Sequence, residues 1–370
     1  MGVNVLPPDI NAGESGFSVK DGNIIYGLSA IKGIGINVID RIVEEREENG
    51  PYLDMDDFAQ RLYDKGVNKK IIENLIKAGA FDSFDANRNQ MLIAFPMIFD
   101  NKSSEKKKTI AGQMSLFDLG DEEIKNSAKT PLPPVGELDK EELLAYEKEV
   151  LGIYVSGHPL ENYKSLLEKN AKNTTKDFIR EVVTDAEGNV ISSECKVNDG
   201  DFTVVGGILN SVKTKTTKNN TIMAFLDLED LYGNIEVIVF PKSYMPNRQN
   251  LVEGEKVLIE GRIQFEDEDS AKILAANIMN FNEVPKKIWL RFKDNEHYNS
   301  VKENMEELLK SSDGKDRVVI YKEKEKEKFM LPVRYLVDVN KDLVEEFEAI
   351  LGKENVAVTY EKAYFKHGSR

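Results

Sequence analysis

Cysteine and histidine, which commonly perform catalysis or bind metals, are few in this chain and are not grouped. Cys195 is the only cysteine, and the three histidines, His158, His297 and His367, lie far apart in the sequence. One cysteine can form neither an internal disulfide nor a thiolate-cluster metal site. Ser156 lies close to His158, but neighbours along a chain seldom form a working catalytic pair. We therefore expect no catalytic residue, no metal ligands and no cofactor in this chain.

A pair of glycines near the N-terminus is suited to binding an anion through the backbone. Apolar residues at helical spacing flank this pair, which predicts two helices joined by a tight turn. The first amides of the second helix would point outward and could hold a phosphate without net positive charge. An ordinary glycine-containing turn in a helical core is the alternative. The residues expected to contact DNA, as a helix-hairpin-helix, are Lys32, Gly33, Ile34, Gly35 and Asn37.

A second, degenerate copy of this motif is expected over residues 68–81. It has one glycine where two are expected, so packing against the first copy and contact with DNA are both open.

A local group of lysines lies in an otherwise acidic protein. The net charge is −15, from 50 basic and 65 acidic residues, so the molecule as a whole repels a polyanion. Residues 211–220, predicted to be the first loop of a barrel, carry Lys213, Lys215 and Lys218 and no acidic residue. Phosphate contact requires such a local reversal of charge, and we expect single-stranded nucleic acid to bind here. A solvated lysine loop is the alternative.

Three phenylalanines of the same barrel could stack on bases or could pack in its core. They are Phe225, Phe240 and Phe265.

A short peptide in a polar stretch carries two large apolar residues with no local core to bury them. This peptide is Gln113-Met114-Ser115-Leu116-Phe117. The pattern is typical of an extended segment that docks into a pocket of a partner, with Gln113 supplying hydrogen bonds and Leu116 and Phe117 supplying buried apolar area. Folding back onto the barrel is the alternative.

The elements that position these residues divide the chain into five regions. They are a hairpin with helices over 1–100, a linker over 101–135, a helical connector over 136–195, a barrel over 196–284 and an α/β region over 285–370. Five short strands separated by turns predict an OB-fold barrel. The last region reads strand, helix, two strands, helix and strand, which predicts a ferredoxin-like sandwich. The fold class is therefore multidomain α+β. No run is apolar enough for a membrane span, and no signal peptide is evident.

In their order these motifs resemble the C-terminal half of the bacterial DNA polymerase III alpha subunit, a family C replicative polymerase of the type without a built-in exonuclease. The resemblance covers nearly the whole chain. Its most similar stretches are residues 6–11, 27–35, 75–82, 151–160 and 224–230.

The resemblance implies a role in template-directed DNA replication. Residues 1–100 would be the end of the fingers with paired helix-hairpin-helix motifs, and Gln113 to Phe117 would bind the beta sliding clamp. The barrel would lie near the single-stranded template, and residues 285–370 would face the clamp-loader tau subunit. The catalytic aspartates of the family and their Mg²⁺ would lie outside this chain. The expected location is the cytoplasm, at the nucleoid-associated replisome, with no membrane partner.

Other classes of protein also combine such modules. A stand-alone, non-catalytic adaptor could link the sliding clamp to DNA. A DNA ligase fragment would share the OB and helix-hairpin-helix modules, but the four zinc cysteines of a NAD-dependent ligase are excluded by the single cysteine. A fragment of an aminoacyl-tRNA synthetase would explain the barrel but not Gln113 to Phe117.

Overall fold

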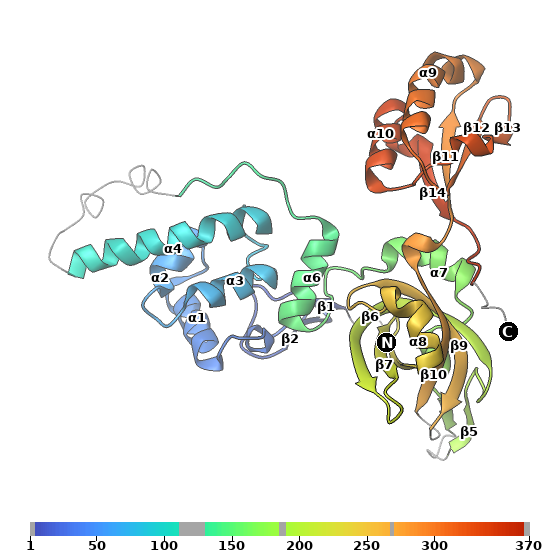
Figure 1. Ribbon diagram of the computed structural model, residues 1–370. Coiled ribbons are helices and arrows are strands. Elements are labelled where there is room, and N and C mark those ends of the chain that lie inside the picture. The colour runs from blue at the N-terminus through green and yellow to red at the C-terminus, as the bar shows by residue number, and fades with distance from the viewer. Residues whose placement is uncertain (1–3, 111–129, 185–189, 267–269, 366–370) are drawn as a thin grey trace. The chain divides into compact units, whose positions relative to one another are not determined.

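The computed structural model describes residues 4–110, 130–184, 190–266 and 270–365 (Figure 1). The chain divides into two compact units, Met1–Pro159 and Leu160–Arg370. None of the helices in this described part is both long enough and apolar enough to cross a membrane.

The N-terminal unit begins with a small sheet. Its strands β1 (Val5–Leu6), β2 (Ser18–Lys20) and β3 (Asn23–Ile25) lie in the order β1-β3-β2. The predicted hairpin between β2 and β3 is confirmed, because Asp21 and Gly22 adopt the positive φ values, 51° and 77°, that such a tight turn requires.

Five α-helices follow in the described part of this unit. They are α1 (Ile36–Asn49), α2 (Met55–Leu62), α3 (Lys69–Lys77), α4 (Arg88–Ile110) and α6 (Lys140–Leu151). Three of them begin at a side chain that accepts a hydrogen bond from the first turn: Asp54 caps α2, Asn68 caps α3 and Asp139 caps α6. Such a cap typically stabilises a helix by about 1 kcal/mol.

These helices enclose one apolar core. Ile39 of α1, Phe58 of α2 and Leu75 of α3 are fully buried in it, and Phe81 packs edge-on against Phe58. Residues 68–81 therefore pack against the first glycine motif, which was one of the two possibilities left open for that segment.

The first half of the predicted helix-hairpin-helix differs from the prediction. Before Gly33 the chain forms a 3₁₀ helix of three residues, Leu28–Ala30, and not an α-helix. The reason is the position of Lys32, whose amide donates to the carbonyl of Val150 at 2.8 Å instead of to a preceding turn. The hairpin is therefore held by α6 as well as by its own helix.

Helix α4 continues beyond the predicted start of the linker at residue 101. The chain stays helical to Ile110. Pro96 lies inside the helix, where a proline removes one backbone hydrogen bond.

The C-terminal unit begins inside the region predicted to be a helical connector. After Pro159 it forms α7 (Lys164–Asn170) and then a hairpin of β4 (Glu181–Thr184) and β5 (Val190–Glu194). The sequence analysis did not predict this hairpin, although the β-branched run Val182 to Thr184 favours a strand.

The predicted five-stranded OB-fold barrel is confirmed. Its strands are β6 (Phe202–Thr216), β7 (Ile222–Glu229), β8 (Asn234–Val239), β9 (Lys256–Phe265) and β10 (Ala271–Asn280), and they close in the order β10-β8-β7-β6-β9 (Figure 1). Alternate residues, such as Leu226 and Val237, fill the interior. Helix α8 (Pro241–Asn247) connects β8 to β9.

The last domain has the predicted order of elements. It consists of β11 (Lys286–Phe292), α9 (Asn295–Ser311), β12 (Arg317–Lys322), β13 (Glu327–Met330), α10 (Lys341–Leu351) and β14 (Val356–Tyr360). The mixed α+β class is thereby confirmed.

The strand order in this domain is not that of a ferredoxin-like sandwich. The sheet runs β13-β12-β11-β14, so the parallel strands β11 and β12 are direct neighbours. A ferredoxin-like sheet would place the third strand between them. Here that strand is β13, which has four residues, and Glu327 and Lys328 within it are exposed. A short, charged strand of this kind is suited to the edge of a sheet and not to its centre.

Candidate nucleic-acid interface

The glycine turn before α1 has the backbone geometry that the sequence predicts. Gly33 adopts φ +78°, a left-handed conformation that side chains rarely tolerate. A Cβ atom at Gly33 would also lie 2.9 Å from the side-chain nitrogen of Asn74. Gly33 is thus required for two reasons, its backbone conformation and the space it leaves.

The N-terminus of α1 is open to an approaching ligand. Gly35 is the N-cap residue, no side chain caps the helix, and a Cβ atom at Gly35 would meet nothing within 4 Å. The first turn carries no acidic residue. The first amides of a helix lack partners within it and carry partial positive charge, so this end can hold an anion such as a phosphate.

The structure separates the five residues predicted for this turn. Lys32, Gly33, Gly35 and Asn37 are exposed at one place, whereas Ile34 is only 7% exposed and packs in the helical core. The side chain of Ile34 therefore anchors the turn and can contribute to a phosphate site only through its backbone.

Asn74 of α3 is a positioning residue that the sequence analysis did not identify. Its side-chain nitrogen donates to the carbonyl of Lys32 at 2.8 Å, and its side chain is 5% exposed. Its oxygen, Oδ1, is buried with no hydrogen-bond partner in the described part of the molecule. Its place in the degenerate second motif was the only signal that could have suggested it.

The lysines predicted on a loop of the barrel lie mainly on a strand. β6 extends to Thr216 and pairs with β7, so Lys213 and Lys215 stand opposite Phe225 and Met223. Only Lys218 lies in the turn itself. The prediction of a loop over 211–220 was wrong because alternating threonines and lysines can extend a two-stranded arm when the partner strand offers matching β-prone residues.

The three lysines of this arm, Lys213, Lys215 and Lys218, are exposed. Within the described ranges, none of their ammonium groups has an ion-pair or hydrogen-bond partner. By contrast, Lys272 on β10 is held by Glu236 at 3.3 Å and Glu266 at 2.8 Å. The arm therefore presents charge that remains available for a phosphate.

An apolar strip lies beside the arm on the outer face of the barrel. Phe225 pairs with Lys213 on one side and with Ile238 on the other, and Ile238 pairs with Leu274. Phe225 is half-buried and is absent from the interior cluster, so its ring is available to a base. This strip next to free lysines matches the stacking platforms that hold single strands.

The other two phenylalanines have different positions. Phe240 follows β8 and is 46% exposed, whereas Phe265 packs against the barrel core.

Arg262 continues the outer strip and was missed. It stands opposite Leu274 on β9 and is exposed, with its guanidinium donating to the carbonyl of Gly200 at 3.2 Å. The alternation of residues along 256–265 places it on the outer face, which is the signal that could have found it.

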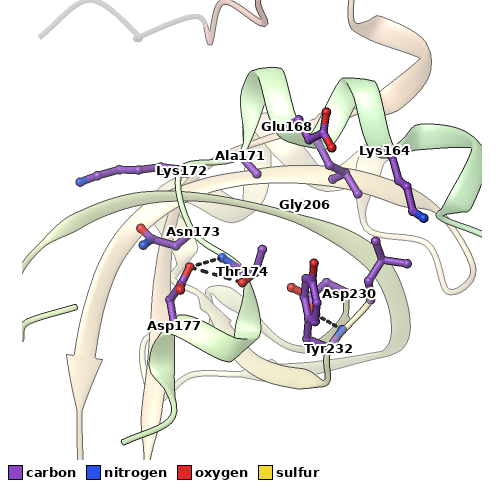
Figure 2. A pocket seen from close by; sticks show the side chains of 12 residues that line it. Lys164, Glu168, Ala171, Lys172, Asn173, Thr174, Asp177, Gly206, Asp230 and Tyr232 are labelled. Atoms are coloured by element: carbon purple, nitrogen blue, oxygen red, sulfur yellow. Dashed lines mark hydrogen bonds between the residues drawn. The ribbon is translucent and has the colours of Figure 1, made fainter. Parts of the chain in front are cut away.

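A pocket of about 360 Å³ lies beside the barrel, between the segment that follows α7 and the β7–β8 turn (Figure 2). The two aspartates lining it are already engaged. Asp230 accepts from the amides of Thr175 at 2.7 Å and Tyr232 at 2.8 Å, and Asp177 accepts from the amide of Thr174 at 2.9 Å. The bond between Thr175 and Asp230 holds the connector to the barrel, and the three bonds together leave neither carboxylate arranged as an acid or base.

The predicted clamp peptide Gln113, Met114, Ser115, Leu116 and Phe117 lies outside the described residues. In the part of the chain that the structure describes, no three metal-ligating side chains converge.

Comparison with known families supports both modules. Residues 2–91 match the helix-hairpin-helix motif, and residues 203–280 match the OB-fold nucleic acid binding domain. The first match contains the Gly33 turn, and the second contains the β6–β7 arm and the outer strip. The chain therefore carries two kinds of nucleic-acid-binding module.

Over most of its length the chain is related to part of the bacterial DNA polymerase III alpha subunit. It is 35% identical to the alpha subunit of Borreliella burgdorferi over 87% of this chain and 27% of that protein. It is 28% identical to that of Bacillus subtilis over 96% of this chain and 30% of that protein. The resemblance to this family is confirmed, and the chain spans less than a third of the length of these relatives.

The chain also aligns over a small part of its length with solved structures. An asparaginyl-tRNA synthetase from Pyrococcus horikoshii aligns with 22% of this chain and 20% of its own, at 16% identity and a TM-score of 0.20.

Proposed function

We propose that this chain is the DNA-binding and clamp-tethering portion of a replicative DNA polymerase III alpha subunit. The observation that carries this proposal is the order of its modules, a helix-hairpin-helix region followed by an OB-fold barrel, within a chain related to alpha subunits over most of its length. Duplex phosphates bind at the α1 N-terminus. The single-stranded template binds along the β6–β7 arm and the outer strip.

The charge distribution supports separate sites for duplex and single-stranded DNA. A chain with a net charge of −15 cannot attract DNA through its overall field, so binding depends on local features. The uncapped helix end offers backbone amides, and the arm offers Lys213, Lys215 and Lys218. Both sites bind phosphates and therefore bind DNA of any base sequence, because phosphate contacts carry no base information. A replicative enzyme requires this independence of DNA sequence.

The remaining assignments follow from the relationship to alpha subunits. Gln113 to Phe117 tethers the chain to the beta sliding clamp, and the C-terminal domain faces the tau subunit of the clamp loader. Nucleotide transfer, with its Mg²⁺ and its aspartates, belongs to the part of the polymerase outside this chain. The same relatives favour this reading over a ligase or synthetase fragment.

A DNA that contains a duplex joined to a single-stranded overhang tests the proposal. Two linked modules that bind adjacent parts of one molecule act together, because the second contact becomes intramolecular. We expect the full chain to bind this junction at least tenfold more tightly than either the duplex or the single strand alone. Fluorescence anisotropy at fixed salt measures the three affinities. Junction binding no tighter than that of the better single component would contradict the proposal.

A further inference from the structure

Among the described residues, the C-terminal sheet has one face that no helix covers. α9 and α10 lie on the other face, where Ile288, Leu290 and Phe292 of β11 are fully buried beneath them (Figure 1). The alternate residues of the four strands point to the opposite side, which we call the open face.

Aromatic and basic side chains share this open face. Strand register places Trp289 and Arg291 on β11 beside Val319 and Tyr321 on β12. Tyr321 in turn stands opposite Lys328 on the edge strand β13. A cross-strand row on the open face therefore reads Arg291, Tyr321 and Lys328, with Trp289 in the next row.

Contacts between these side chains confirm that they lie on one surface. The indole nitrogen of Trp289 donates to the hydroxyl of Thr359 at 2.8 Å, and the ammonium of Lys328 lies 5.5 Å from the centre of the Trp289 ring. Arg291 donates to the side-chain oxygen of Asn355 at 2.9 Å. These bonds hold the indole and the guanidinium in place before any ligand arrives.

The charge on the open face is opposite to that of the whole chain. Lys287, Arg291, Arg317 and Lys328 occupy its strand positions, and none of its strand positions in β11, β12, β13 or β14 holds an acidic residue. The carboxylate of Glu361, just beyond β14, is held by Lys287 at 2.8 Å. With Lys287 paired to Glu361, the three cations Arg291, Arg317 and Lys328 form a locally positive surface around two aromatic rings, in a chain of net charge −15.

We propose that the open face is a further binding surface for single-stranded nucleic acid. Bases stack on Trp289 and Tyr321, and Arg291, Arg317 and Lys328 contact the phosphates. A four-stranded sheet whose aromatic residues stack bases while nearby cations bind the backbone is a recurring solution for single strands. Charge complementarity selects a polyanion as the occupant. This surface would lengthen the single-stranded path without relying on the barrel.

Trp289 provides a probe that reports on this surface alone. It is the only tryptophan of the chain, so its emission does not sense other sites directly. We expect a short oligothymidylate, titrated into the full chain, to quench this emission in a saturable way. Raising the salt concentration should weaken the binding, since counterions compete for the phosphates.

A charge-removing variant with a matched control tests the role of the cations. Arg291→Gln with Lys328→Gln keeps both side-chain stems, and we expect at least fivefold weaker binding. Loss of two phosphate contacts should lower the slope of log affinity against log salt by about 1.4. The control is Lys302→Gln with Lys310→Gln on α9, whose side chains are 48% and 65% exposed. This control removes the same charge from the same domain and should bind like the parent.

A third variant distinguishes binding at the open face from binding at the barrel. Lys213→Gln with Lys215→Gln and Lys218→Gln weakens the barrel arm and should leave the quenching of Trp289 unchanged. If quenching disappears in this variant, the probe senses only a strand held by the barrel and the proposal is wrong. The proposal would also be overturned if no oligonucleotide changed the Trp289 emission, or if the Arg291/Lys328 variant and its control bound equally well. In either case the open face would be assigned to a protein partner.

Discussion

At the scale of single residues, Gly33 is the position where the turn is least tolerant of change. Its φ of +78° and the nearby Asn74 side chain both exclude a Cβ atom. Asn74 bonds the carbonyl of Lys32, so a displaced Asn74 would also release the turn that orients the α1 amides.

Gly33→Ala should therefore lower both stability and duplex binding. A left-handed conformation costs a residue with a side chain about 1 to 2 kcal/mol. Thermal unfolding and anisotropy with a duplex measure the two effects. Gly136→Ala is the matched control, since Gly136 has an ordinary φ and open space around it, and it should change neither quantity. Parent-like duplex binding by a folded Gly33→Ala protein would remove the turn from the DNA site.

Glu45 is the residue whose ionisation most directly supports the helical unit. It is 7% exposed, and it bonds to Lys65, to Arg61 at 3.2 Å and to Asn49 at 2.8 Å. The bond to Lys65 is the main cause that holds the pKa of Glu45 below its ordinary value of 4.5. A carboxyl group with a lowered pKa in the folded state stabilises the fold above its unfolded pKa, and this contribution is lost as pH falls through the folded pKa.

Glu45→Gln should thus reduce the hydrogen-exchange protection of the α1 and α2 amides at neutral pH. The difference in protection between the variant and the parent should narrow as pH falls below about 4.5. Hydrogen exchange of the α1 and α2 amides, compared between the two proteins at each pH, measures this gap. Glu44→Gln, on the exposed side of α1, should match the parent throughout. A gap of constant size across the acid range would show that ionisation of Glu45 does not contribute.

At the scale of elements, the β6–β7 arm decides how the barrel presents its charge. As a paired strand it fixes Lys213 and Lys215 on one face, beside Phe225, whereas a flexible loop would spread the same charges. Fixed cations next to a half-buried ring are suited to a single strand that follows one direction across the barrel.

Lys213→Gln with Lys215→Gln and Lys218→Gln should weaken single-strand binding by the barrel and leave duplex binding unchanged. Each lost phosphate contact should reduce the slope of log affinity against log salt by about 0.7. Anisotropy across a salt series measures both. A triple variant at Lys302, Lys310 and Lys341, which lie on α9 and α10, removes equal charge as a control. Equal salt slopes for the two triple variants would exclude the arm.

At the scale of the whole molecule, the proposed clamp binding would depend on Gln113 to Phe117, which lie outside the described residues. Leu116→Ala with Phe117→Ala should weaken binding to the cognate sliding clamp by about a hundredfold or more, since each 1.4 kcal/mol is about tenfold in affinity. Calorimetry measures the affinity, and circular dichroism with thermal unfolding should show no change. Unaltered affinity would remove the clamp assignment, and a lowered melting temperature would show that the two side chains pack inside the protein.

The sequence by itself determined the local features of this protein. Apolar periodicity placed the five barrel strands and the helices α1, α3, α9 and α10, although the helix predicted before Gly33 is a 3₁₀ helix. The Gly33-Ile34-Gly35 pattern located the turn at the start of α1. These features depend on neighbours along the chain, because backbone conformation and strand alternation are local properties. The same local logic identified Lys213, Lys215 and Lys218 as a cationic group.

Only the tertiary structure decided which distant residues meet. It placed Asn74 against Lys32, buried Ile34, and turned the predicted lysine loop into a paired arm. It also put β11 next to β12, which brings Trp289, Tyr321 and the neighbouring cations together on one face of the sheet. The sequence analysis had predicted another strand order for this sheet. Strand order and burial are set by competition among elements far apart in the chain, so local periodicity cannot determine them.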